Sequence, residues 1–139
     1  MLDKKDLEAL QKIFNSYPEI IAVYLFGSYL EKSKQGGDID LAVLLKTSGR
    51  GMVNLYMDLH PRLAEMFAPL EVDLLFLNSA SLPVCFEVIK TGRVVYSADD
   101  ISRTDFEDLV ADHYMDFRHH LETARRELYE AVKEGGAFV

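Results

Sequence analysis

The first half of the chain alternates between apolar positions at helical spacing and unbroken apolar runs. Between residues 3 and 17 the apolar positions recur along one helix face, and Pro18 ends the predicted helix. Residues 20–26 form a continuous run rich in β-branched side chains, which is typical of a strand buried on both faces. Residues 38–45 have the pattern of a second strand. A helix followed by two strands is therefore expected in this half.

The second half continues the alternation of helices and strands. Residues 52–67 predict a helix, in which Pro61 predicts a kink or a break into two pieces. A third strand is expected at residues 71–77, a short helix at 81–90 and a last short strand at 93–96. These elements indicate one small domain that contains both helices and strands.

Residues 102–134 predict one long helix that ends at two glycines. Its apolar residues recur at alternating steps of four and three, the spacing of a coiled-coil seam: Val110, Tyr114, Phe117, Leu121, Ala124, Leu128 and Ala131. Such a helix is about 50 Å long, whereas a compact domain of this size is only about 37 Å across. Unless it bends back, its distal end is expected to overhang the domain and to need a partner.

Composition narrows the classes of function. The chain has 139 residues, with 15 Lys and Arg against 23 Asp and Glu, a formal net charge of −8. No basic cluster offsets this charge, so a long nucleic acid is not the expected substrate. The longest apolar run has seven residues and the N-terminus has no signal-peptide core, so neither a membrane span nor secretion is expected. The single Cys85 suits a reducing compartment, and the expected location is the cytoplasm.

Two aspartates open the second predicted strand. Asp38 and Asp40 are two residues apart, so their side chains leave the strand from the same face. Their carboxylates can converge on one hard cation, or on two cations roughly 4 Å apart. The alternative is an exposed Asp-x-Asp pair at the start of a strand, close to a turn.

The end of the first predicted strand has the features of a phosphate-binding turn. Gly27 ends the strand and Ser28 opens a short helix, which leaves backbone N–H groups and a hydroxyl free to bind phosphate. The alternative is that Ser28 only caps this helix together with Glu31. A third carboxylate, Asp73, interrupts the third strand, where a metal ion, the other aspartates or an ordinary hydrogen-bond partner would offset the cost of burial.

The order of these motifs resembles the active-site signature of the DNA polymerase beta-like nucleotidyltransferase superfamily: Phe26-Gly27-Ser28, nine further residues, Asp38-Ile39-Asp40 and later Asp73. By size the chain is most similar to the minimal nucleotidyltransferase (MNT), the MntA-like antitoxin of HEPN/MNT toxin–antitoxin pairs. The resemblance implies the α/β (α+β) nucleotidyltransferase fold, a small mixed β-sheet of about four strands flanked by helices, with a long C-terminal helix. It implies a single domain over residues 1–139, with the catalytic core at 1–98 and a possible partner-docking helix at 99–139.

The same resemblance implies the chemistry of the site. Gly27 and Ser28 would bind the triphosphate of ATP, and Asp38 and Asp40 would hold one or two Mg²⁺ ions. Asp73 would join the metal site or act as a general base. AMP would pass to a tyrosine hydroxyl of a HEPN toxin, an RNase that is thereby inactivated, and the chain would be the antitoxin of a type VII pair.

Two departures from the family pattern concern the triphosphate. Many relatives have ten residues between the serine and the first aspartate, where this chain has nine, and many have a basic residue where Tyr29 stands. Either a triphosphate contact is missing, or Lys32 or Lys34 takes it over. Because all three carboxylates are present, an active enzyme is expected. The alternatives are a non-catalytic antitoxin that docks through its C-terminal helix, and a nucleotidyltransferase acting on a small molecule such as an aminoglycoside, for which the chain is short.

Overall fold

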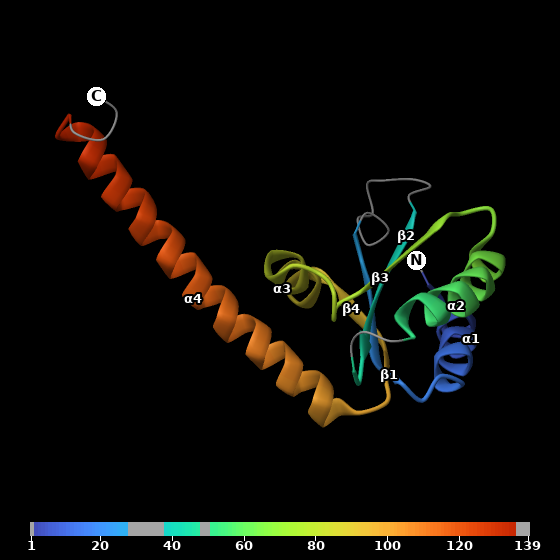
Figure 1. Cartoon of the computed structure of the whole chain (residues 1–139). Coiled ribbons are helices and arrows are strands. Elements are labelled where there is room, and N and C mark those ends of the chain that lie inside the picture. The colour runs from blue at the N-terminus through green and yellow to red at the C-terminus, as the bar shows by residue number, and fades with distance from the viewer. Residues whose placement is uncertain (1, 28–37, 48–50, 136–139) are drawn as a thin grey trace.

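The computed structural model of the chain describes residues 2–27, 38–47 and 51–135. In this part, four strands form one sheet in the order β3-β2-β1-β4, and helices lie on both of its faces (Figure 1). In chain order the elements are α1 (Lys4–Asn15), β1 (Ile20–Phe26), β2 (Ile39–Leu45), α2 (Met52–Phe67), β3 (Val72–Phe76), α3 (Leu82–Thr91), β4 (Arg93–Ser97) and α4 (Asp100–Lys133).

The sheet is mixed, as predicted. β1 pairs antiparallel with both β2 and β4, whereas β2 pairs parallel with β3. The unbroken apolar run is the inner strand β1, and all of its residues except Phe26 are buried. The parallel step from β2 to β3 needs a crossover, which α2 provides. The α/β fold expected from the sequence is confirmed.

Alternating side chains divide the core into two layers. Val23 and Leu25 of β1 belong to the layer beneath α1 and α2, whereas Ala22 and Tyr24 belong to the layer beneath α3 and the start of α4 (Figure 1). Cys85 of α3 is buried in the second layer, so this thiol is a core residue.

The predicted break at Pro61 is wrong, because α2 is one continuous helix. A buried apolar stripe runs along the helix on both sides of the proline: Leu55, Leu59, Leu63 and Phe67. Pro61 itself lies on the exposed face. There solvent can hydrate the carbonyl of Met57, which loses its helical N–H partner to the proline ring. Packing of the stripe against the sheet therefore outweighs the local cost of the proline.

The long C-terminal helix α4 begins two residues earlier than predicted, because Asp99 accepts a hydrogen bond from the Ser102 N–H and caps it. Within α4 only Val110 is fully buried. Tyr114 still stacks on Phe86 of α3, and beyond this contact the helix stands clear of the rest of the described molecule (Figure 1). The helix overhangs the domain and does not bend back. No helix in the described ranges combines the length and the hydropathy that crossing a bilayer requires.

Three polar side chains hold the first turns of α4 against the sheet. The buried Tyr24 hydroxyl donates a hydrogen bond of 2.8 Å to Glu107. Arg103 donates to both carboxylate oxygens of Glu107, at 3.2 and 3.1 Å, and also to Ser97 of β4. Burial, followed by the hydrogen bond to Glu107, raises the pKa of Tyr24, so the phenol stays neutral and donates. This Tyr24–Glu107–Arg103 clamp fixes the direction in which α4 leaves the sheet.

Replacing Glu107 by leucine is expected to lower the free energy of unfolding by about 2 kcal/mol, because the Tyr24 hydroxyl is left buried without an acceptor. Urea unfolding measures the change. The control is Glu122→Leu, which breaks the exposed Arg118–Glu122 pair on the same helix and should cost less than about 0.5 kcal/mol. Equal losses in the two variants would contradict a stabilising role for the clamp.

Candidate active site

Two of the three predicted carboxylates lie next to each other at one end of the sheet. The parallel register of β2 and β3 places Asp40 opposite Asp73. The neighbours of Asp40, Ile39 and Leu41, are fully buried in the layer beneath α1 and α2. The Asp40 side chain therefore points to the opposite face, toward the α3 and α4 side. Asp38 precedes it by two residues and belongs to the same face.

The three carboxylates differ in their exposure to solvent. Asp73 is exposed rather than buried, because β3 is an edge strand, and Asp38 is exposed as well. Asp40 is half-buried. Burial raises the pKa of Asp40, and the charge of Asp73, a hydrogen bond with Asp73 and the charge of Asp38 raise it further. The three aspartates therefore form a concentrated site of negative charge.

Gly27 lies directly against the carboxylate of Asp40. Its φ is +80°, in the left-handed region that favours glycine. A Cβ added at Gly27 would lie 2.1 Å from Oδ2 of Asp40 and 3.0 Å from its Cγ, closer than real atoms pack. The turn after β1 thus requires glycine for its backbone conformation and also for the space that the Asp40 carboxylate fills.

The donor chemistry of this site fits a hard divalent cation. Carboxylate oxygens are the ligands that Mg²⁺ prefers, and a cation would offset the repulsion that raises the Asp40 pKa. Within the described ranges, no three Asp, Glu, His or Cys side chains are already arranged as a ligand set for a metal ion. The metal role of Asp38, Asp40 and Asp73 therefore stays a prediction.

This prediction can be tested on the protein without nucleotide. In metal-free protein the carboxyl of Asp40 should titrate above 3.8, the ordinary value for aspartate, and Mg²⁺ should lower its pKa because a bound cation favours the ionised form. Carbon-detected NMR of the aspartate carboxyls during a pH titration measures both values. An Asp40 pKa that does not move with Mg²⁺ would contradict metal binding at this site.

Three of the predicted nucleotide-binding residues lie outside the described residues: Ser28, Lys32 and Lys34. Their contacts with a triphosphate stay predictions. Gly27 is described. It directly follows the last residue of β1, Phe26, which pairs with Asp40 of β2, and it lies against the Asp40 carboxylate.

Comparison of the sequence with models of known protein families identifies the family of this chain. Residues 8–101 match the family model described as polymerase beta, nucleotidyltransferase, which covers most of the chain and includes Gly27, Asp38, Asp40 and Asp73. The chain belongs to the polymerase beta nucleotidyltransferase family. The match ends where α4 begins, so this helix lies almost entirely beyond the family model.

Several solved structures similar to this nucleotidyltransferase come from toxin–antitoxin pairs. One is a chain of the tri-AMPylated Shewanella oneidensis HEPN toxin in complex with MNT antitoxin, at 25% identity and a TM-score of 0.62, covering 95% of this chain and 99% of that chain. Another is a chain of a toxin–antitoxin structure with AMP-PNP, at 25% identity and a TM-score of 0.64, covering 92% and 98%. A chain of the MntA-HepT structure, at 23% identity and a TM-score of 0.62, covers 94% and 99% and shows the shared fold. The resemblance to minimal nucleotidyltransferases is confirmed, and none of the curated proteins matches this sequence.

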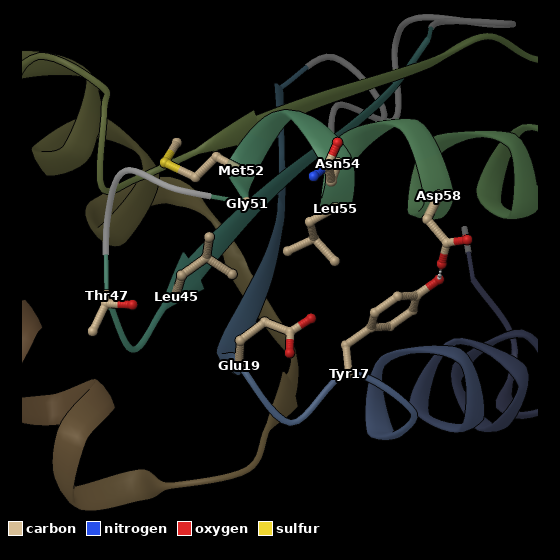
Figure 2. A pocket seen from close by; sticks show the side chains of 9 residues that line it. All are labelled: Tyr17, Glu19, Leu45, Thr47, Gly51, Met52, Asn54, Leu55 and Asp58. Carbon is tan, nitrogen blue, oxygen red and sulfur yellow. Dashed lines mark hydrogen bonds between the residues drawn. The ribbon is translucent and has the colours of Figure 1, made fainter.

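A cavity of about 430 Å³ lies at the other end of the sheet of this nucleotidyltransferase (Figure 2). It is lined by residues at the start of β1, the end of β2 and the start of α2, including Glu19, Leu45 and Asp58. β2 runs from Asp40 at one end of the sheet to Leu45 at this cavity. The cavity is therefore separate from the aspartates, and it is not the candidate nucleotide site.

Sequence reasoning missed two features of the nucleotidyltransferase site and its support. It explained Gly27 by the turn of the chain and by phosphate approach, although this glycine also makes room for the Asp40 carboxylate. It also missed the clamp that holds α4, for which the i,i+4 spacing of Arg103 and Glu107 was the available signal. The buried partner of this ion pair, Tyr24, lies 83 residues away and left no local signal.

Proposed function

We propose that this nucleotidyltransferase transfers AMP from ATP to a tyrosine hydroxyl of a HEPN toxin, in a Mg²⁺-dependent reaction, and thereby neutralises the toxin as its antitoxin. The observation that carries the proposal is the pairing of Asp40 with Asp73 beside Gly27 in a chain of the polymerase beta nucleotidyltransferase family. Similar chains occur in complexes with an AMPylated HEPN toxin and with AMP-PNP, which supports this acceptor and this nucleotide.

Each residue of the site has a role in the proposed reaction. Gly27 and Ser28 would hold the triphosphate at the turn after β1, with Lys32 and Lys34 as further triphosphate contacts. Asp38 and Asp40 would bind one or two Mg²⁺ ions, which neutralise charge on the phosphates when bound. Asp73 lies on the exposed edge strand, so it is open to an incoming acceptor and would accept the hydroxyl proton, or join the metal site.

The proposed transfer balances without a covalent enzyme intermediate. The acceptor oxygen forms a bond to the α-phosphorus of ATP, and the bond between that phosphorus and the bridging oxygen of the β-phosphate breaks. Pyrophosphate leaves with the bonding electrons, and the hydroxyl proton passes to Asp73 or to water. Positioning of the reactants and electrostatic stabilisation would supply most of the acceleration.

Intact-mass spectrometry tests the proposal directly. The chain is incubated with ATP, Mg²⁺ and the protein encoded by the neighbouring gene, which the proposal expects to be a HEPN toxin. This partner is expected to gain the mass of one or more AMP groups. Peptide mapping then identifies the modified side chain. A partner that is neutralised without any gain in mass would overturn the catalytic proposal and would favour a non-catalytic antitoxin.

A further inference from the structure

The distal half of α4 carries apolar side chains that the described part of the chain leaves uncovered. The proximal part is packed: Val110 is buried, and the Tyr114 ring stacks on Phe86 with centroids 4.0 Å apart. From there on the seam residues are open to solvent. The exposed fractions of Phe117, Leu121 and Leu128 are 45%, 40% and 54%.

This exposed segment is too long to be explained as a frayed helix end. From Phe117 to the end of α4 at Lys133 the helix extends about 25 Å beyond its last packed residue. A helix of this length is marginal in water by itself, and its stability normally comes from burying its apolar face. The seam from residue 117 to 131 therefore fits a surface that another helix covers. The charged residues along the two edges of the seam indicate which kind of helix this is.

The two edges of the seam carry opposite charges. Arg118 and Arg125 lie along one edge, and Glu127 and Glu134 lie along the other. Arg118 also pairs with Glu122 at 3.2 Å on the exposed surface, which leaves Arg125 as the less compensated cation of that edge. Charges at these flanking positions set the choice and the orientation of a partner helix.

A second copy of this chain does not complement these edges in an antiparallel arrangement. Antiparallel helices bring like edges together, so Arg118 of one copy would face Arg125 of the other, twice in the dimer. In the same register the glutamates of the other edge would face histidines, Glu127 opposite His120 and Glu134 opposite His113. The two arginine contacts bring like charges close together without an opposing charge.

A parallel pair of copies is no better matched. In that arrangement each residue on one edge faces the residue five positions later on the opposite edge of the other copy. His113 would then face Arg118, His120 would face Arg125, and Glu127 would face Val132. Neither arrangement of two copies pairs an arginine with a glutamate across the seam, so the flanking charges disfavour self-association.

We propose that the exposed seam of α4 docks one amphipathic helix of a different protein, with acidic side chains opposite Arg118 and Arg125 and basic side chains opposite Glu127 and Glu134. Naming this protein as the HEPN toxin rests on the proposed function. The similar chain in the complex with the AMPylated toxin covers 95% of this chain, so most of α4 is shared with a protein crystallised with its partner. Docking on α4 would tether the acceptor protein to the domain that carries the aspartates, because the clamp fixes the first turns of α4 to the sheet.

The test compares two substitutions at adjacent positions of the same helix. Leu128→Asp places a charge in the seam, whereas Tyr129→Asp places the same charge on a somewhat more exposed residue outside it. Affinity for the protein encoded by the neighbouring gene is measured by titration calorimetry without ATP. Leu128→Asp is expected to weaken binding by about 30-fold or more, as at an interface hot spot, and Tyr129→Asp by less than about threefold. Circular dichroism checks that both variants keep their helix.

Charge reversal and oligomeric state provide the remaining outcomes. The variant Arg118→Glu/Arg125→Glu should weaken binding, and sedimentation equilibrium should find the chain monomeric at the same concentrations. Equal affinities for Leu128→Asp and Tyr129→Asp would overturn the docking surface, and a dimer that Leu128→Asp dissociates would assign the seam to a second copy. If binding depends on Leu128 but the partner never gains AMP, the docking inference stands and the proposed function fails. If the partner gains AMP but its binding does not depend on Leu128, the proposed function stands and the docking inference fails.

Discussion

Replacing Asp38 and Asp40 together by asparagine is expected to lower the rate of AMP transfer at least about a thousandfold. Metal ions at transferring phosphates contribute several kcal/mol of transition-state stabilisation, and each 1.4 kcal/mol is about a tenfold change in rate. Asparagine keeps the size of both side chains but removes the charges that would hold Mg²⁺. Single-turnover transfer, followed by intact mass, measures the loss.

The matched control is Asp112→Asn/Asp116→Asn, which makes the same change in net charge at two exposed positions of α4. It should leave the rate of transfer unchanged. Thermal unfolding separates chemistry from folding. Because the pKa of Asp40 is raised in the folded state, its favourable contribution to stability is lost as the pH rises through that pKa. At pH 7 the site variant should therefore be as stable as the parent or more stable, and a destabilised variant would undermine the assignment.

Substituting Gly27 by alanine is expected to reduce AMP transfer about a hundredfold while the fold is retained. The new Cβ would lie 2.1 Å from Oδ2 of Asp40, so the carboxylate must move out of its place beside the turn. Displacement of a reacting group by about 1 Å costs about that factor in rate. The positive φ adds about 1–2 kcal/mol of backbone strain for a residue with a side chain.

Gly51 provides the control for the strain alone. Its φ is +90°, but a Cβ added there meets nothing within 4 Å. Gly51→Ala should therefore lose a similar amount of stability in urea unfolding and keep full transferase activity. If both alanine variants lose activity equally, the loss at Gly27 comes from reduced stability rather than from the displaced carboxylate.

The sequence predicts the fold well where burial is continuous. Residues 20–26 have one interpretation because a run of seven apolar residues must be covered on both faces, and this run is the inner strand β1. Pro61 shows the limit of local reasoning. Its cost to the helix is visible in the sequence, but the buried leucines on both sides that outweigh it are decided by packing against the sheet.

The candidate site is predictable in its residues but not in its geometry. The Asp38–Asp40 spacing is enough to place both carboxylates on one face of a strand. The position of Asp73 opposite Asp40 depends on the order of the strands, which local pattern does not determine. The exposure of Asp73 follows from the same order, since a strand at the edge of a sheet leaves one side open.

Because the parallel pairing of β2 with β3 joins segments that are distant in sequence, we expect the site to be completed late in folding. Gly27 and Asp40 come together when two antiparallel strands near in sequence pair, but Asp73 arrives only after the α2 crossover is complete. In the described sheet β3 is an edge strand that pairs with β2 alone. Its Val72 carbonyl also forms a hydrogen bond of 2.8 Å with His60 of α2. Fraying of this strand would separate Asp73 from its partner before the rest of the sheet opens. A chain in which β3 has left the sheet would therefore still present the exposed seam of α4, although Asp73 would be missing from the candidate site.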